Sequence, residues 1–369
     1  MHTALVHDWL VSIGGGEKAL QGIHELFPGD IFTLFHNAKK LDGTYFDNKK
    51  IIPSSLQKLP FALKKYQNFL PLFPYAIEQF DFSEYDLIIS SSHCAAKGAL
   101  THADQMHICY CFTPVRYAWD LYHQYLDQTH LKKGAKGLIA KLILHYFRMW
   151  DKSSSSRVDA FVAISKYVAV RINKIYGRQA DVIYPPVNTN YYSLEENKQD
   201  YYLTASRMVP YKRIDLIVQA FSQMPDKKLV VIGDGPEMKK VKSFATKNIE
   251  ILGHVSDQTM KDYMQKAKGF VFAALEDFGI LPVEAQSAGT PVIAFGKGGS
   301  LETVGKECGV FFQKQDVTSL IDAVNRFEKM TFDPKAIRKH AMKFSVERFK
   351  EEFENLILQK YQNWTENSI

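Results

Sequence analysis

The sequence predicts an α/β protein with two doubly wound parallel-sheet domains, and three observations support this fold class. At 369 residues, the chain is too long for one ordinary hydrophobic core. Its hydrophobic content of 46% is typical of a globular chain and not of a disordered one. Short, nearly continuous apolar runs alternate with helical patterns, as expected for strands that are covered on both faces of a parallel sheet.

Nine apolar runs are predicted to be buried strands. Four lie in the first half of the chain and five in the second, at residues 3–7, 86–92, 106–111, 159–165, 201–206, 228–233, 249–252, 268–274 and 291–295. Between the halves, residues 182–193 (VIYPPVNTNYYS) contain the prolines and asparagines of a hinge. We therefore expect an N-terminal domain over 1–185, a C-terminal domain over 186–345, and a last helix over 346–369 that returns to the first domain.

Composition excludes several classes of protein. The four cysteines (Cys94, Cys109, Cys111 and Cys308) form no C-x-x-C pair, so we expect reduced thiols and no zinc site. The first residues lack the pattern of a signal peptide, and no apolar run is long enough to span a membrane, which favours a cytoplasmic location. The net charge of +6 matches the charge of residues 131–157 alone, which favours a local anionic surface as partner over nucleic acid.

Functional residues are expected where strands lead into helices, in a cleft that the two domains face. In the first domain, Gly14, Gly15 and Gly16 precede a predicted helix, where glycines let a ligand approach the backbone and free amides attract an anion. The spacing is not that of a dinucleotide fingerprint, so a flexible turn is an equal alternative.

In the second domain, Arg207 follows a predicted strand and Lys212 stands at the start of the next helix. Two cations at a helix N-terminus are unfavourable for the helix dipole unless an anion lies between them. Their position therefore favours phosphate binding over two solvated surface bases. The strand-to-helix turn with Gly233 and Gly235 is interpreted as a short turn near the ligand.

Two acids surround a short apolar run in EDFGILPVEAQSAGTPVIAFGKGGSLETV, residues 276–304. Glu276 follows a predicted strand, Pro282 is expected at the first helical position, and Glu284 falls in the first turn of that helix. Such a pair could belong to a glycosidase. The nearby cations point instead to a phosphorylated donor, for which a carboxylate can hold sugar or ribose hydroxyls. The alternative for Glu284 is a helix cap.

The motifs S-R-x-x-x-x-K-R, G-D-G-P and E-D-F-G-x-x-x-x-E-A-x-x-x-G-T-P-V together resemble the retaining family 4 glycosyltransferases of GT-B fold. The stretches VHDWLVSIGGGEKAL and CYCFTPVRYAWDLY resemble the bacterial O-antigen mannosyltransferases of this family. The resemblance implies a nucleotide-sugar donor, no required metal or other cofactor, and an acceptor bound by the first domain.

The resemblance also implies roles for particular residues. Arg207 and Lys212 would hold the diphosphate, Glu276 the transferred sugar and Glu284 the donor ribose. Backbone amides near the donor would come from Gly15, Gly16, Gly233, Phe278, Gly279 and Ile280. One departure is Phe112, which stands where family members often carry a histidine that contacts the sugar. Candidates for sugar or acceptor contact are therefore His93, Arg116 and Asp120, with a purely structural His93 as the alternative.

The basic window contains a predicted helix, GAKGLIAKLILHYFRMWDK, over residues 134–152. Its cations Lys141, Arg148 and Lys152 share one side, and seven apolar residues lie on the other (Leu138, Ile139, Leu142, Ile143, Tyr146, Met149 and Trp150). The simple interpretation puts the apolar side in the core and the cations in water. The alternative is contact with an anionic membrane, where a lipid-linked acceptor would be found.

These observations favour a hexosyltransferase that moves mannose from GDP-mannose to a growing, lipid-linked bacterial surface glycan at the inner face of the cytoplasmic membrane. The alternatives are a GT-B enzyme that uses a UDP-sugar, an epimerase or phosphorylase of the same fold, and an inactive glycan-binding relative. A phosphorylase requires a lysine-bound pyridoxal phosphate, of which the sequence shows no sign.

Overall fold

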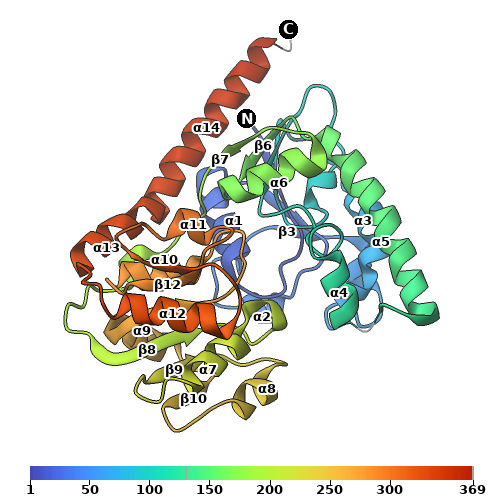
Figure 1. Ribbon diagram of the computed structural model, residues 1–369. Coiled ribbons are helices and arrows are strands. Elements are labelled where there is room, and N and C mark those ends of the chain that lie inside the picture. Colours follow the sequence, from blue (N-terminus) through green and yellow to red (C-terminus); the bar gives the residue numbers. More distant parts are fainter. Residues whose placement is uncertain (130, 368–369) are drawn as a thin grey trace. The chain divides into compact units, whose positions relative to one another are not determined.

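The computed structural model describes residues 1–129 and 131–367, which form two compact units (Figure 1). Unit 1 comprises Met1–Pro185 and Phe349–Ile369, and unit 2 comprises Pro186–Arg348. Each unit has a parallel β-sheet and hydrophobic clusters of its own.

Unit 1 is built on a seven-stranded parallel sheet in the order β3-β2-β1-β4-β5-β6-β7. Its strands are β1 (Thr3–His7), β2 (Asp30–Thr33), β3 (Ile51–Pro53), β4 (Leu87–Ser92), β5 (Met106–Cys111), β6 (Ala160–Ala163) and β7 (Ala180–Val182). Central strands β1, β4 and β5 are buried along their whole length, because helices and loops cover both faces of the sheet. In register, Leu5 of β1 pairs with Ile31 on one side and Ile89 on the other.

The helices of unit 1 connect these strands. They are α1 (Gly15–Leu26), α2 (Ala38–Leu41), α3 (Phe73–Ile77), α4 (Tyr122–Gln128), α5 (Gly134–Ser154) and α6 (Lys166–Tyr176), with the 3₁₀ turns η1 (Ser55–Lys58), η2 (Tyr66–Leu72), η3 (Ala96–Gly98) and η4 (Ser155–Arg157). The ends of α6 follow from its sequence: the Ser165 hydroxyl accepts the amide of Val168, and Gly177 ends the helix in the left-handed conformation.

Unit 2 has a six-stranded parallel sheet in the order β10-β9-β8-β11-β12-β13. Its strands are β8 (Gln199–Ala205), β9 (Leu229–Ile232), β10 (Ile249–Gly253), β11 (Ala267–Phe272), β12 (Val292–Phe295) and β13 (Gly309–Phe312). Its helices are α7 (Ile214–Ser222), α8 (Met238–Ser243), α9 (Asp257–Lys266), α10 (Ile280–Ser287), α11 (Ser300–Thr303), α12 (Val317–Phe327) and α13 (Pro334–Ala341), with η5 (Thr189–Tyr191), η6 (Pro210–Lys212) and η7 (Met342–Phe344).

The last helix, α14 (Val346–Asn367), begins in unit 2, and its residues from Phe349 onward belong to unit 1. Phe349 and Phe353 pack there against Tyr110 of β5, and Phe353 also contacts Phe27. Among the described residues, no helix has the length and apolar character needed to cross a membrane.

Both sheets reverse their strand order at one point. In unit 1 the reversal lies between β1 and β4, and in unit 2 it lies between β8 and β11. At such a point the loops that follow the two neighbouring strands leave in opposite directions, and ligands of open α/β sheets bind beside them. Several candidate site residues lie in these loops, namely His93 in unit 1 and Arg207, Lys212 and Glu276 in unit 2.

Candidate functional site

Lys212 and Glu276 meet at the strand reversal of unit 2. Lys212 ends η6, in the loop that follows β8, and Glu276 lies in the loop that follows the adjacent strand β11. Their side chains form an ion pair between Nζ and Oε1. The sequence assigned one of them to the donor phosphate and the other to the sugar, and the fold brings the two side chains into direct contact.

Arg207 lies two residues beyond the end of β8 and is exposed. Its backbone carbonyl accepts the amide of Val209, which curves the loop toward Lys212. Arg207 and Lys212 therefore stand on one short loop at the carboxyl edge of the sheet. This arrangement places two cations on one loop at the edge of the sheet.

The backbone around Lys212 is tightly constrained. Arg213 adopts the left-handed conformation, with φ of 55°, and serves as the N-cap of α7. A non-glycine residue in this region is uncommon and costs conformational energy, and such residues concentrate at functional sites. The turn fixes the place at which the Lys212 side chain leaves the loop.

Glycines after β12 explain the rigid position of the Glu276 loop. The Gly299 amide donates to the carbonyl of Glu276 at 2.8 Å. A Cβ on Gly298 would lie 2.5 Å from that same carbonyl, and a Cβ on Gly299 would lie 2.4 Å from the Cα of Phe278. The two loops therefore pack backbone against backbone, which only glycine permits here.

Helix α10 begins two residues earlier than the sequence indicated. Gly279, with φ of 93°, is its N-cap, and Ile280 is its first residue. The expectation that Pro282 opens the helix is therefore wrong, because the left-handed glycine allows the chain to turn into the helix sooner. The side chain of Phe278 is buried against Phe344, so a ligand at this helix start can meet only its backbone.

Glu284 projects from α10 and is hydrogen-bonded to the hydroxyl of Tyr192. Burial raises the pKa of Tyr192, and the negative charge of Glu284 raises it further. Tyr192 therefore stays protonated and donates its hydroxyl proton to Glu284. Glu284 is in the second turn of α10 and does not cap it, so the helix-cap alternative is excluded.

Gly233 has a structural reason to be glycine. It follows β9 with φ of 127°, and a Cβ there would lie 1.9 Å from the carbonyl oxygen of Ser206. The loop after β9 thus packs closely against Ser206 in the loop after β8. This contact sets the position of Arg207, which follows Ser206 in the chain. A role for Gly233 in donor binding stays a prediction.

In unit 1, a buried carboxylate that the sequence reasoning missed organises the strand reversal. Asp8 follows β1, is fully buried, and accepts four backbone amides from the turn after β4. One oxygen binds the amides of His93 and Cys94 at 2.6 and 2.9 Å, and the other binds those of Ala95 and Ala96 at 2.6 and 2.7 Å. The signal was an acid directly after a buried strand, in TALVHDWL.

His93 completes this arrangement, with its Nδ1 3.0 Å from Oδ2 of Asp8. Burial alone would raise the pKa of Asp8, but the charge of His93 and the hydrogen bonds from His93 lower it below its usual range. Burial opposes the protonation of His93, but the Asp8 carboxylate raises its pKa above 6.5. The Asp8 carboxylate thus favours the protonated form of His93 at the carboxyl edge of the sheet.

The glycine turn lies beside this pair. Gly15 and Gly16 are the first two residues of α1, and Glu17 accepts the amide of Gly14 at 2.9 Å. Glu17 also approaches the imidazole of His7, with Oε1 3.8 Å from Nε2. A Cβ on Gly16 would make only an ordinary contact with Phe112, at 3.6 Å. Internal packing thus does not require glycine at position 16.

The loop after β5 is clamped to α6. The buried guanidinium of Arg171 pairs with Asp120 and donates to the Pro114 carbonyl at 3.2 Å. Asp120, a candidate for acceptor contact, therefore has a structural partner. Arg116 lies partly buried in the same loop. Contacts of Arg116 and Asp120 with a sugar stay predictions.

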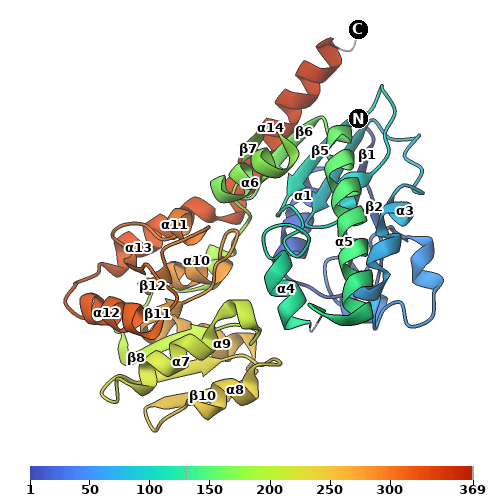
Figure 2. The ribbon, with the colours of Figure 1, turned by 45° about the vertical axis from the view of Figure 1, so that its right-hand side comes forward.

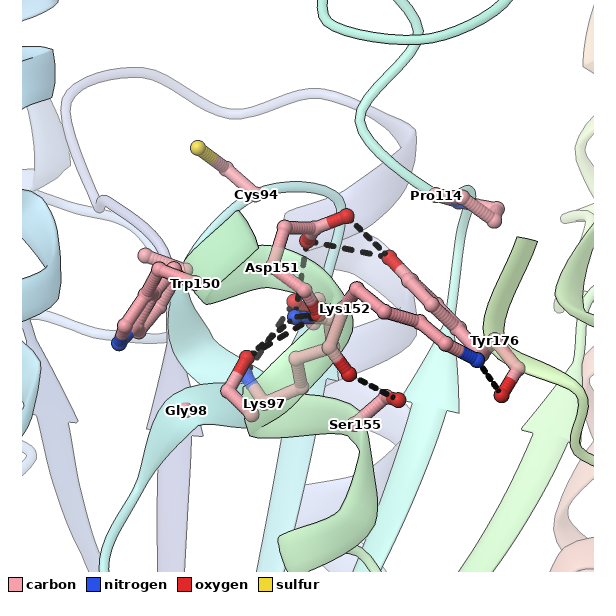
Figure 3. A network of polar contacts seen from close by, with 12 residues as sticks. Cys94, Lys97, Gly98, Pro114, Trp150, Asp151, Lys152, Ser155 and Tyr176 are labelled. Atoms are coloured by element: carbon pink, nitrogen blue, oxygen red, sulfur yellow. Dashed lines mark hydrogen bonds and ion pairs between the residues drawn. The ribbon is translucent and has the colours of Figure 1, made fainter. Parts of the chain in front are cut away.

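A buried network of polar contacts connects the turn after β4 and the loop after β5 to helices α5 and α6 (Figure 3). Lys97 of η3 and Asp151 of α5 form a buried ion pair at 2.8 Å, and Lys97 also donates to the hydroxyl of Ser154 at 2.8 Å. The other oxygen of Asp151 accepts the indole of Trp119 at 2.7 Å and the hydroxyl of Tyr176 at 3.0 Å. One carboxylate thus joins α5, α6, the turn after β4 and the loop after β5.

All four cysteines are free and buried. Within residues 1–129 and 131–367, no group of three or more His, Cys, Asp or Glu side chains is arranged to hold a metal ion.

Comparisons with known proteins match this chain to glycosyltransferases. Residues 192–344 match the family model of the glycosyl transferases group 1. A GDP-mannose-dependent monoacylated alpha-(1-6)-phosphatidylinositol monomannoside mannosyltransferase of Corynebacterium glutamicum is 33% identical over 130 residues, which cover 31% of this chain and 34% of the relative. The O-antigen chain mannosyltransferase of Salmonella typhimurium is 28% identical over 159 residues, which cover 40% and 45%.

The fold has a counterpart among solved structures. The crystal structure of HepE from Anabaena in complex with UDP-glucose superposes with a TM-score of 0.68 at 18% identity, covering 97% of this chain and 100% of the other. At this identity the likeness establishes the fold alone. The chain spans about half or less of the length of the curated relatives it matches.

The two parallel-sheet units and the structural match define the GT-B fold, which confirms the predicted fold class. Residues 192–344 of unit 2 are thus similar to the glycosyl transferases group 1 and to mannosyltransferases, and the whole chain has the fold of the GT-B glycosyltransferases.

Proposed function

We propose that the protein is a retaining hexosyltransferase that moves mannose from GDP-mannose to a lipid-linked glycan. The observation that carries the proposal is the pair of cations, Arg207 and Lys212, on one loop at the strand reversal of unit 2. A nucleoside diphosphate is the ligand that such a pair suits. The choice of mannose rests on the mannosyltransferase relatives, of which one is GDP-mannose-dependent by name.

The chemical step requires a departing diphosphate. The bond between the anomeric carbon of the sugar and the phosphate oxygen breaks, and its electron pair leaves with the nucleoside diphosphate. An acceptor hydroxyl oxygen bonds to the anomeric carbon, and its proton passes to the departing phosphate. Arg207 and Lys212 stabilise the negative charge that develops, because charge-assisted hydrogen bonds to phosphate are strong in a preorganised site.

The remaining residues position the donor. Glu276 accepts hydrogen bonds from the hydroxyls of the transferred sugar, and Glu284, oriented by Tyr192, accepts those of the ribose. The amides of Gly279 and Ile280 begin α10 and face the phosphate or sugar. In unit 1, the amides of Gly15 and Gly16 lie against the diphosphate, and His93 contacts the sugar or the acceptor.

A UDP-sugar is the second candidate donor. The structural neighbour from Anabaena was solved with UDP-glucose, so the same fold accommodates that class of ligand. The acceptor is proposed to be a bacterial surface glycan on a lipid carrier, reached from the inner face of the cytoplasmic membrane. This assignment rests on the Salmonella relative, whose name gives an O-antigen chain.

The donor is identified by measuring thermal stability with a panel of GDP- and UDP-sugars, because a ligand that binds the folded state raises the melting temperature. We expect the largest increase with GDP-mannose. The same panel is then tested for transfer to a lipid-linked acceptor, with the anomeric configuration of the product read by NMR. A larger increase in melting temperature with a UDP-sugar would show that the donor is a UDP-sugar and not GDP-mannose. Binding without any turnover would support an inactive relative.

Metal independence is part of the proposal. Arg207 and Lys212 supply the positive charge next to the leaving group, so a divalent cation is not needed there. Turnover is expected to be unchanged by an excess of EDTA. Loss of turnover with EDTA, restored by a divalent cation, would show that the cations alone do not stabilise the diphosphate.

A further inference from the structure

The outward side of α5 is apolar. Five of its large apolar side chains are between 50% and 66% exposed, namely Leu138, Ile139, Leu142, Tyr146 and Met149. The buried residues of the helix are Gly137, Leu144, Phe147, Asp151 and Ser154. The simple interpretation from the sequence is therefore wrong in placing the apolar side in the core, although Lys152 is exposed as it expects.

Polar anchors explain this orientation. Asp151 is bound by Lys97 beneath the helix, at 2.8 Å. Arg148 donates to the carbonyl of Ala118 at 3.1 Å, and Lys152 donates to the carbonyl of Tyr176. These contacts turn the side of α5 that carries Arg148, Asp151 and Lys152 toward the rest of unit 1. Leu138, Leu142 and Tyr146 consequently face outward.

A second exposed apolar segment precedes α3. Phe61 is 71% exposed and has φ of 59°, which is rare for a residue other than glycine. It is followed within the same segment by further exposed apolar side chains, at Leu63, Leu72 and Tyr75. An aromatic side chain held outward at a strained loop position is unfavourable in water unless it has another partner.

The two elements lie side by side and share an apolar groove. Figures 1 and 2 both show α3 beside α5. The groove has a volume of about 420 Å³ and is lined by Pro71 and Pro74 on one side and by α5 on the other, through Ile139, Leu142, Ile143, Tyr146, Phe147 and Trp150. We call the surface formed by the exposed apolar residues of α5, by residues 59–75 and by this groove the α5 face.

The segments that form the α5 face are predominantly basic. Residues 55–77 and 131–150 contain eight Lys or Arg residues and no Asp or Glu: Lys58, Lys64, Lys65, Lys132, Lys133, Lys136, Lys141 and Arg148. Lys64, Lys65, Lys133 and Lys136 are exposed. Lys132 forms an ion pair with Asp127, but Lys133 and Lys136 are also exposed near the start of α5, where the helix dipole disfavours cations, so they indicate an anionic partner.

We propose that the α5 face binds the interfacial region of an anionic lipid bilayer. Its apolar side chains enter the boundary between headgroups and acyl chains, and the surrounding lysines contact anionic headgroups. A helix with an outward apolar row and nearby bases is suited to lie in this interface, and its attachment is reversible. The inference rests on the proposed function, because a lipid-linked acceptor would be met at such a surface.

Co-sedimentation with vesicles tests the proposal. The vesicles are phosphatidylcholine alone, or equal parts of phosphatidylcholine and phosphatidylglycerol, at low and high salt. The apolar variant carries Phe61→Gln, Leu142→Gln and Tyr146→Gln. Its matched control changes three exposed apolar residues of unit 1 outside the face, Leu100, Val170 and Leu358, to Gln.

The charge variant carries Lys64→Gln, Lys65→Gln and Lys136→Gln. Its control removes the same charge from exposed lysines of unit 2, at Lys242, Lys247 and Lys329. Wild type is expected to sediment with the anionic vesicles at low salt and much less at high salt. The charge variant should bind them about fivefold more weakly for each lysine removed. The apolar variant should lose binding under all conditions, and both controls should bind as wild type does.

Three results would overturn the proposal: wild type that ignores anionic vesicles at low salt, an apolar variant that binds as well as wild type, or an equal loss in the matched controls. A wild-type mass that doubles in solution and falls only in the apolar variant would assign the face to a second copy of this chain. Thermal-shift measurements with GDP-mannose are made on every variant. Membrane binding without donor binding would contradict the proposed function alone, and donor binding without membrane binding would contradict this inference alone.

Discussion

Lys212 and Glu276 form an ion pair across the strand reversal of unit 2, from the loops after β8 and β11. The pair neutralises a lysine that a diphosphate would otherwise engage. In the proposed function, donor binding would place a second anion beside Lys212, and the ammonium could contact both because it has three donors. In the proposed function, Glu276 thus orients Lys212 and also accepts hydrogen bonds from the hydroxyls of the transferred sugar.

Arg207→Ala and Lys212→Ala test the diphosphate assignment. Each is expected to lower kcat/KM by about 2–3 kcal/mol, or roughly 30- to 150-fold, the range for a lost charge-assisted hydrogen bond. Steady-state kinetics with GDP-mannose measure the effect, and Lys247→Ala, an exposed lysine of the same unit, is the control. Turnover near wild type in both single variants would remove these residues from the donor site.

The two glutamates are expected to affect different ligands. Glu284→Gln should weaken binding of the nucleoside diphosphate itself, because Glu284 is assigned to the ribose and is oriented by Tyr192. Glu276→Gln also removes the partner of Lys212, but it should change that affinity less than Glu284→Gln does and should mainly lower turnover of the intact sugar donor. Calorimetric titration with GDP, beside kinetics with GDP-mannose, separates the two. Equal losses of GDP affinity would show that the division of roles is wrong.

The sequence predicted nine strands, and all nine are present within a residue or two of their predicted bounds. Four strands were missed: β2, β3, β7 and β13. These strands are only three or four residues long, and β3 and β7 lie at the edge of the sheet in unit 1. A run such as Ala180–Val182 is too short for an apolar pattern to distinguish it from a loop. The long central strands carried the clear signal because they are buried on both faces.

The candidate site was predicted in part. The residues after β8 and β11 were recognised because motifs and strand ends coincide there. Asp8 was not recognised from the sequence, because it binds the backbone amides of a turn that lies more than eighty residues further along the chain. The orientation of α5 was wrong for a related reason. Periodicity identifies two sides of a helix, but the polar partners of Arg148, Asp151 and Lys152 determine which side faces the rest of unit 1.

Asp8→Asn should destabilise unit 1 strongly. The amide group would place a donor against two backbone amides that also donate, and would remove the charge that His93 balances. We expect a loss of about 3–5 kcal/mol in the free energy of unfolding, as for breaking a buried pair. All four tryptophans (Trp9, Trp119, Trp150 and Trp364) belong to unit 1, so their fluorescence in urea follows its unfolding. A loss below about 1 kcal/mol, the range of exposed ion pairs, would contradict the structural role of Asp8.

His93 should make the stability of unit 1 dependent on pH. Because its pKa in the folded protein is raised above 6.5, the folded state binds the proton more tightly than the unfolded state does. The stabilisation is complete below pH 6.5 and is lost as pH rises through the raised pKa. Urea denaturation of wild type and His93→Gln from pH 6 to pH 9 should show a difference that shrinks with rising pH. A constant difference would mean that His93 is not charged in the folded protein.

The Lys97–Asp151 pair gives the sharpest test of how unit 1 is held together, because its two side chains are buried and a matched exposed pair exists. Lys97→Met leaves a buried carboxylate, and Asp151→Asn leaves a buried ammonium. Each is expected to lower the free energy of unfolding by about 3–5 kcal/mol. The double variant removes both charges and keeps an acceptor for Trp119 and Tyr176, so it should be clearly more stable than the sum of the single effects predicts.

The exposed pair Lys132–Asp127 is the control, and breaking it should cost about 0–1 kcal/mol. Tryptophan fluorescence in urea measures all these variants. Strict additivity at Lys97 and Asp151, or an equal cost at the exposed pair, would show that burial of this ion pair does not anchor α5.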